Sequence, residues 1–406
     1  MAIITANELP HSIPTEPLQR LFLRFLRFGC MAWGGPVAQI AMIRQELVDE
    51  ERWISNERFN RVLAVYQILP GPEAHELCVY FGMLSRGRIG GLLAGLGFML
   101  PGFVLMFLLS WVYVAYGITN TLLAGLFYGF QPAVAALIFR AVHRIGQHAI
   151  SDHWLMGIAV LAAVAQILGI PFLITLLAGG ASYVLIRRQH HHLGIAVGIG
   201  VFALVLIASL LGVFQPQIAA QSGTAAQAVH PSLGMLFLSG LKAGLLTFGG
   251  AYTVIPFLQQ DAVINGGWMS NAMFLDGLAL SGILPAPLII FSTFVGYIGG
   301  GPLGAVALTV GIFAPAFGFT LIGHDVLERL IQHPSLAIFL EGVTAGVVGL
   351  ISATSLGLLG TALRDIPSIV IFCVGLILLY RWKSKMVVPV VVLVGGLIGL
   401  ILVGLR

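Results

Sequence analysis

Charged residues inside apolar stretches are the first candidates for chemistry in this sequence. Arg27 and Lys242 each lie two helical turns before a pair of consecutive glycines, in segments rich in apolar residues. A charge in such a segment is energetically unfavourable, so it usually serves a function. Two cations beside two glycine pairs would form an electropositive site for an oxyanion. The alternative is that these long side chains extend from an apolar segment to water.

Three titratable residues form a second candidate site. Glu73, His75 and Glu76 follow Pro72 directly, in what we expect to be the first turn of a helix. A carboxylate there can simply complement the positive end of the helix dipole. The functional alternative is proton coupling, because histidine titrates near neutral pH and a partly buried carboxyl group can carry a proton.

Glycines and prolines interrupt four apolar stretches near their centres. Proline removes a backbone donor and glycine lets the chain turn, so each stretch should break there. A half-helix that starts at a break directs free N–H groups at a ligand, which suits an anion. Each break could belong to a re-entrant hairpin or to one kinked span. The predicted substrate-binding residues at the breaks are Gly34, Gly35, Pro36, Pro70, Gly71, Pro72, Gly249, Gly250, Pro285 and Pro287.

The amino-acid composition indicates that these apolar segments lie in a lipid bilayer. Of 406 residues, 58% are hydrophobic and 9% are charged, whereas soluble domains carry about 25% charged residues. The sequence therefore predicts an all-α polytopic membrane protein with about 13 hydrophobic segments, each able to cross the bilayer or enter it. Cys30, Cys78 and Cys373 lie in apolar stretches and suggest neither a disulfide nor a metal site. No basic run interleaved with aromatic residues indicates a nucleic-acid partner.

The chain contains an internal repeat. Residues 22–72 align with 237–287 without a gap, so that Trp53 matches Trp268 and Pro70 matches Pro285. Arg27 and Lys242 also occupy equivalent positions. We therefore expect a polar segment over 1–17, a first transmembrane repeat over 18–188, a joining span and outer loop over 189–232, and a second repeat over 233–406.

The distribution of positive charge predicts that the two copies have inverted topology. Arginines are frequent in the first-copy loop 44–61 and absent from its counterpart 259–276, and arginine and lysine gather in 381–385 where the first copy has none. Positive residues stay on the cytoplasmic side, so equivalent loops of opposite bias lie on opposite faces. Inverted repeats are typical of secondary transporters, with the substrate site where the copies meet. Duplication for stability alone is the alternative.

These residues resemble the chromate ion transporter family in its long, two-domain form. The resemblance implies an inner-membrane carrier that exports chromate and confers chromate resistance, with antiparallel homologous halves. It covers nearly the whole chain. The motifs that carry it are Phe28-Gly29, Trp33-Gly34-Gly35-Pro36, Trp53-Ile54-Ser55, Leu69-Pro70-Gly71-Pro72, Gly82, Phe248-Gly249-Gly250, Trp268 and Gly277.

We therefore expect a multi-pass bacterial inner-membrane transporter for chromate or a sulfate-like oxyanion, without a cofactor, a metal site or catalytic residues. Its partners would be the oxyanion and the lipid bilayer, and a homodimer is compatible with this interpretation. A sulfate carrier and a passive anion channel remain alternatives. An intramembrane enzyme would need a nucleophile with a base, or a metal-binding cluster, and the sequence suggests neither.

Overall fold

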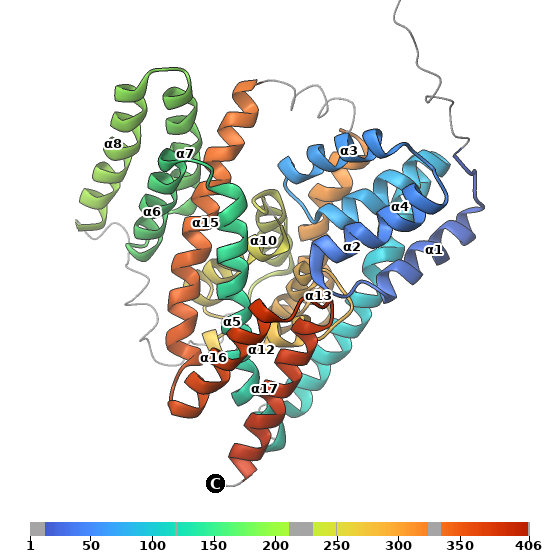
Figure 1. Ribbon diagram of the computed structural model, residues 1–406. Coiled ribbons are helices and arrows are strands. Elements are labelled where there is room, and N and C mark those ends of the chain that lie inside the picture. Colours follow the sequence, from blue (N-terminus) through green and yellow to red (C-terminus); the bar gives the residue numbers. More distant parts are fainter. Residues whose placement is uncertain (1–12, 118–120, 211–229, 249, 324–333, 405–406) are drawn as a thin grey trace, which may run out of the picture.

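Every regular element of the described residues is helical. The computed structural model describes residues 13–117, 121–210, 230–248, 250–323 and 334–404 (Figure 1). The all-α prediction is confirmed, and a multi-pass membrane protein is indicated; the number of hydrophobic segments stays a prediction. Five described helices are long and apolar enough to cross a membrane: Glu73–Tyr116, Leu122–Ala149, Leu288–Leu321, Ser335–Ala362 and Val387–Gly404.

The two copies contain matching elements in the same order. The first copy consists of α1 (Leu18–Cys30), α2 (Gly35–Arg44), the π-helix η1 (Gln45–Glu50), α3 (Asn56–Ile68), α4 (Glu73–Val112), the π-helix η2 (Tyr113–Gly117), α5 (Thr121–Ala149), α6 (His153–Ile167) and α7 (Phe172–Arg187). Helix α8 (His191–Leu210) follows. The second consists of α10 (Leu233–Leu245), the 3₁₀ helix η3 (Ala251–Thr253), α11 (Val254–Gln259), the π-helix η4 (Gln260–Asn265), α12 (Asn271–Gly282), the 3₁₀ helix η5 (Leu288–Ile290), α13 (Phe291–Leu321), α15 (Pro334–Ala362), α16 (Ile366–Arg381) and α17 (Val387–Gly404).

The two copies also share their π-helices and their helix caps. The expected loops 44–61 and 259–276 instead contain π-helices η1 and η4 and the starts of α3 and α12. The side chains of Ser55 and Ser270 cap these two helices, each accepting a hydrogen bond of 3.2 Å from a backbone N–H. Serine at this position satisfies a donor that the first helical turn leaves free.

Helices α4 and α13 each fold back on themselves. The turns lie at Arg86–Gly87 and Gly300–Gly301, and the second residue of each has φ 61°, a conformation that glycine adopts readily. A Cβ atom on Gly82 would lie 2.4 Å from the carbonyl oxygen of Gly90, so the two arms of α4 pack with their backbones in contact. The equivalent glycines of α13 approach as closely. Each long helix is therefore a short arm and a long arm packed side by side.

The chain also turns back at the predicted breaks. The rings of Phe59 in α3 and Phe81 in the short arm of α4 stack with centroids 6.5 Å apart. One kinked span would separate these residues by most of the membrane thickness, so the geometry favours a helical hairpin with Pro70–Pro72 at its tip. Arg24 of α1 likewise reaches Glu46 of η1 at 3.0 Å, across the break at Gly34–Gly35.

The copies are interleaved. Helix α5 of the first copy packs on α16 and α17 of the second, and α15 of the second packs on α6 and α7 of the first (Figure 1). The contacts use glycine: a Cβ on Gly129 would meet the carbonyl oxygen of Gly395 at 1.9 Å, and one on Gly342 that of Gly179 at 2.7 Å. Small residues allow this close approach of membrane helices. With the helices exchanged in this way, a hairpin tip of the first copy contacts one of the second, since the N–H of Gly71 lies 2.9 Å from the carbonyl oxygen of Thr247.

Candidate functional site

Three hairpin tips surround one cavity. The N–H of Gly71, at the tip between α3 and α4, donates a 2.9 Å hydrogen bond to the carbonyl oxygen of Thr247, at the tip between α10 and α11. A cavity of about 400 Å³ lies beside this contact. The tips contribute Pro36, Gln67, Glu73 and Gly250 to its lining, and helix α5 and Thr344 of α15 close the remaining sides. Both copies therefore form the cavity wall.

Helix α5 directs a basic stripe into the cavity. Arg140, Arg144 and His148 line it and are spaced four residues apart, which places them on one face of the helix. Among the described residues, neither arginine has a carboxylate oxygen within 4.0 Å. Arginine presents several N–H donors in a planar fork that matches oxyanions. The sequence analysis did not identify these residues.

Two of the tip glycines have open space beside their backbone. Of the residues predicted at the breaks, Pro36 and Gly250 line the cavity, and Gly35 directly precedes Pro36. Gly35 and Gly250 have φ values of +77° and +117°, and a Cβ on either residue would meet no atom within 4 Å. Gly34 has φ +89°, but its Cβ would lie 2.8 Å from the Cβ of Lys385. Gly35 and Gly250 therefore combine a backbone shape that favours glycine with open space beside it. Gly249 lies outside the described residues.

The predicted coupling residues separate into two environments. Glu73 lines the cavity and lies close enough to Arg144 for electrostatic interaction. His75 and Glu76 are fully buried behind it. The ring of His75 packs on Phe313 and Phe317 with centroids 4.9 and 4.7 Å apart.

Glu76 has an unusual position. Its carboxyl group faces the Pro70–Pro72 tip, since a Cβ on Gly71 would lie 2.8 Å from its Oε1 atom. Neither of its oxygens has a hydrogen-bond partner among the described residues. The side chain therefore lacks the hydrogen bonds that usually stabilise a buried carboxyl group.

Arg27 and Lys242 do not line the cavity. Each forms an ion pair with the π-helix of its own copy, Arg27 with Glu46 and Lys242 with Asp261. Asp261 also accepts a 2.6 Å hydrogen bond from the hydroxyl of Ser239. The two pairs occupy equivalent positions, so the duplication preserved both the cation and its carboxylate. An acidic residue at the same place in both π-helices was the sequence signal for this pairing.

The fourth predicted break also lies apart from the cavity. Ala286, between Pro285 and Pro287, packs against α4, where a Cβ on Gly102 would meet its Cβ at 2.5 Å. None of these three residues belongs to the cavity lining. The structure thus brings together breaks from both copies, but not all four.

A buried polar network connects the copies on another side of α5. Asp276 of α12 accepts hydrogen bonds of 2.8 Å from the hydroxyl of Tyr113 and from the side-chain amide of Gln131. The amide oxygen of Gln131 in turn accepts one of 3.0 Å from Arg364. Because a buried carboxylate is stable only when it is hydrogen-bonded, this network fixes α12 against α5.

Comparison with known proteins assigns the chain. The sequence model of a family described as chromate transporter matches twice, over residues 19–185 and 234–400. The chain belongs to the chromate transporter family. Because the family model matches twice, the chain contains two copies of the family's domain. Among solved structures, none matches the chain.

Named members of the chromate transporter family cover the chain almost completely. A chromate transport protein of Pseudomonas aeruginosa is 54% identical over 95% of this chain and 92% of its own length. One of Cupriavidus metallidurans is 29% identical over 98% of the chain and 96% of its own length. A probable chromate transport protein of Synechococcus elongatus is 28% identical over 98% of both proteins.

Proposed function

We propose that this protein carries chromate across the membrane through the cavity between the hairpin tips. The observation that supports this most strongly is the pair Arg140 and Arg144, which face the cavity without a carboxylate within ion-pair distance in the part of the chain that the structure describes. With Glu73 also ionised, the lining has a net charge of about +1, which favours an anion. The names of the relatives supply the identity of that anion.

We propose that the oxyanion is bound by the guanidinium groups of α5 and by the backbone at the hairpin tips. A tetrahedral dianion can accept hydrogen bonds from Arg140 and Arg144 on one side and approach the open backbone at Gly35 and Gly250 on the other. The earlier prediction that Arg27 and Lys242 bind the oxyanion directly is not tested by these observations. Because both already have carboxylate partners, we assign the primary role to the arginines of α5.

Glu73 supplies a coupling mechanism. As a carboxylate it competes with the substrate for Arg144, so the empty cavity has an internal counter-ion. Protonation of Glu73 would remove this competitor and favour oxyanion binding, which links one proton to one substrate. Glu76, buried behind the tip, is the proposed proton relay, and His75 accompanies it in the same helical turn.

We propose that the transporter faces the cytoplasm with its first-copy hairpins and that its two copies are inverted in a bacterial inner membrane. Export and chromate resistance then follow from the membrane potential, since a dianion leaving a negative cytoplasm gains about 4.6 kcal/mol per 100 mV, and about 2.3 kcal/mol when one proton leaves with it. Cysteine labelling on a cysteine-free background tests the inversion. Finding 44–58 and 259–271 on the same face would refute it. A homodimer stays a prediction.

Transport in proteoliposomes tests the function. We expect the purified protein to carry chromate, and Arg140→Gln with Arg144→Gln to abolish this flux without reducing the amount of folded protein. Arg20→Gln, which removes an exposed arginine of α1 outside the cavity, is the matched control. Chromate flux that survives the double substitution would place the binding site elsewhere. Flux that ignores a pH gradient would favour a passive channel.

A further inference from the structure

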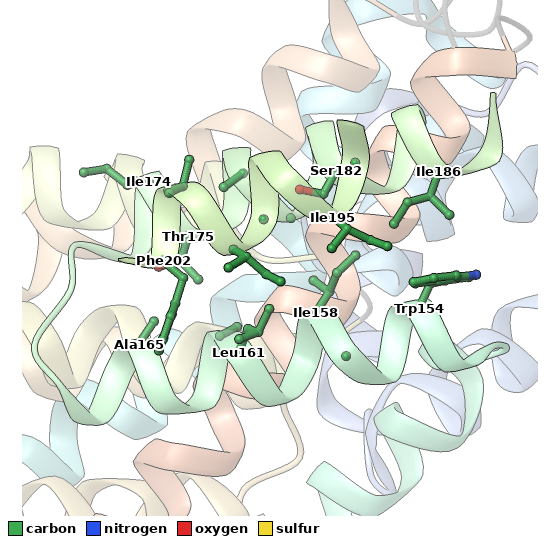
Figure 2. A pocket seen from close by; sticks show the side chains of 18 of the residues that line it. Trp154, Ile158, Leu161, Ala165, Ile174, Thr175, Ser182, Ile186, Ile195 and Phe202 are labelled. Atoms are coloured by element: carbon green, nitrogen blue, oxygen red, sulfur yellow. The ribbon is translucent and has the colours of Figure 1, made fainter. Parts of the chain in front are cut away.

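A second cavity is separate from the transport site. It is a groove of about 210 Å³ between α6, α7 and α8 (Figure 2). Its lining is almost entirely apolar, with Ile158 and Leu161 from α6, Ile174 from α7 and Phe202 from α8. None of the residues of the transport cavity takes part in it. Transport of an oxyanion gives this apolar groove no role.

The dimensions of the groove match one lipid leaflet. Along α7 it extends from Ile186 to Ile174, which is about 18 Å at 1.5 Å per residue. One leaflet contributes about half of the ~30 Å hydrocarbon thickness. A groove of this length, open along the shorter apolar helices α6, α7 and α8, suits a single acyl chain lying parallel to the helix axes.

One end of the groove is basic and aromatic. The ring of Trp154, which lines the groove, stacks on His191 with centroids 5.9 Å apart. Arg187 and Arg188 follow Ile186 directly and are exposed. Tryptophan and basic residues gather where membrane helices meet the lipid headgroups, and basic sites between helices bind anionic headgroups. Asp152 interacts electrostatically with Arg187, but its two oxygens accept hydrogen bonds from the hydroxyl of Tyr183 at 2.8 Å and from the backbone N–H of Leu155 at 2.9 Å. Arg188 donates a 2.6 Å hydrogen bond to the hydroxyl of Ser335, which leaves its other N–H groups for a ligand.

A free hydroxyl group lies inside the groove below this basic end. Ser182 is only 3% exposed, and its Oγ atom has no hydrogen-bond partner among the described residues. It lies one helical turn from Ile186, about 6 Å deeper along α7. Figure 2 shows its side chain among those that line the groove. An ester carbonyl of a phospholipid would lie at this depth and could accept the missing hydrogen bond.

We propose that this groove binds an anionic phospholipid, with one acyl chain between α6, α7 and α8 and the phosphate held by Arg187, Arg188 and His191. Ser182 donates to the ester group. The lipid fills a groove that the chain leaves open and fastens α8 to the first copy. The positive-inside rule places this end of the groove at the cytoplasmic leaflet.

The test is lipid retention by the full chain. The protein is released from vesicles that contain equal amounts of phosphatidylglycerol and phosphatidylcholine, and the bound lipids are counted by native mass spectrometry. We expect phosphatidylglycerol to be retained preferentially. Arg187→Gln and Arg188→Gln should each lower that preference about fivefold. A single basic residue near the membrane surface strengthens the binding of anionic lipid by about this factor. Lys383→Gln, in the turn between α16 and α17, should leave the preference unchanged.

A second variant fills the groove without disturbing its walls. A Cβ on Gly157 would meet no atom within 4 Å, and leucine is a better helix former than glycine. Gly157→Leu should therefore abolish retention of both lipids, while the protein still purifies as a folded monodisperse species. Equal retention of the two lipids by the wild-type protein would overturn the proposal. So would undiminished retention by Gly157→Leu, or occupation of the groove by a second copy of the chain, detected as a crosslink between Gly157→Cys protomers.

Discussion

Glu73 and Arg144 should affect oxyanion binding in opposite directions, although both line the same cavity. If the arginine attracts the substrate and the glutamate competes with it, Arg144→Gln must weaken binding and Glu73→Gln must strengthen it. A purely structural role would make both substitutions harmful. The sign of the Glu73 effect therefore separates a competing carboxylate from a helix-end residue that merely complements the dipole.

The size of the cavity sets the magnitude. A sphere of 400 Å³ has a radius of about 4.6 Å, so a dianion at its centre lies about 5.5 Å from charges on the wall. Coulomb's law then gives about 1.5 kcal/mol for each wall charge at the dielectric constant of water and about 3 kcal/mol at half that value. Because Arg144 is exposed to the cavity, the lower figure is the better guide. The dissociation constant should change between about 10-fold and about 150-fold, upwards for Arg144→Gln and downwards for Glu73→Gln.

Equilibrium binding of chromate to the purified protein at several pH values measures this effect. In the wild-type protein the affinity should rise as the pH falls and Glu73 becomes protonated. At every pH at which chromate remains a dianion, the affinity should be high in Glu73→Gln and low in Arg144→Gln. Glu57→Gln, which removes an exposed carboxylate of α3 outside the cavity, is the control. Weaker binding by Glu73→Gln, or a pH profile like that of the wild type, would refute the competition.

Three further changes test other parts of the site. Leucine at Gly35 or Gly250 should abolish chromate flux but leave membrane insertion intact, because the side chain would occupy open space beside the backbone; near-normal flux would make both tips simple turns. Lys242→Gln should destabilise the protein by about 2 kcal/mol, since it leaves Asp261 without its partner, and adding Asp261→Asn should restore both stability and flux; lost flux in the stable double variant would instead show that Lys242 binds substrate. Burial alone would raise the pKa of Glu51, but hydrogen bonds from Arg24 and Trp53 outweigh it and lower that pKa, so thermal stability should fall as the pH falls through the lowered value, less steeply in Glu51→Gln.

The sequence predicted the scaffold well because glycine and proline act locally. The paired glycines and the Pro–Gly–Pro break stand at hairpin tips, where positive φ values or a missing N–H are required. The turns at Arg86–Gly87 and Gly300–Gly301 lie where we expected equivalent loops, because the alignment sets Arg86 and Arg88 against the uncharged Gly300–Pro302. That the two arms on either side of each turn pack with their backbones in contact was not predicted.

The cations of the site were predicted less well. Arg140 and Arg144 lie near the end of an apolar helix, where arginines usually flank a membrane span, and the second copy has no equivalent. The only sign that they act together was their four-residue spacing with His148, which places all three side chains on one face of the helix. Arg27 and Lys242 attracted attention because the duplication preserved them, but it preserved Glu46 and Asp261 as well. A pairwise comparison of carboxylates between copies would have predicted the ion pairs.

The exchange of helices between the copies has a consequence for biosynthesis. Helix α5 completes its packing only after α16 and α17 have been made, more than 200 residues later in the chain. During translation, the glycine face of α5 around Gly129 must therefore remain in lipid, or in contact with the insertion machinery, until Gly395 has been made. The arginine stripe on the same helix waits for the hairpin tip that contains Gly250, which is made earlier. A cell that makes this protein thus assembles the proposed anion site only after synthesis has entered the second copy, so a chain that stops before that copy would insert without this cavity.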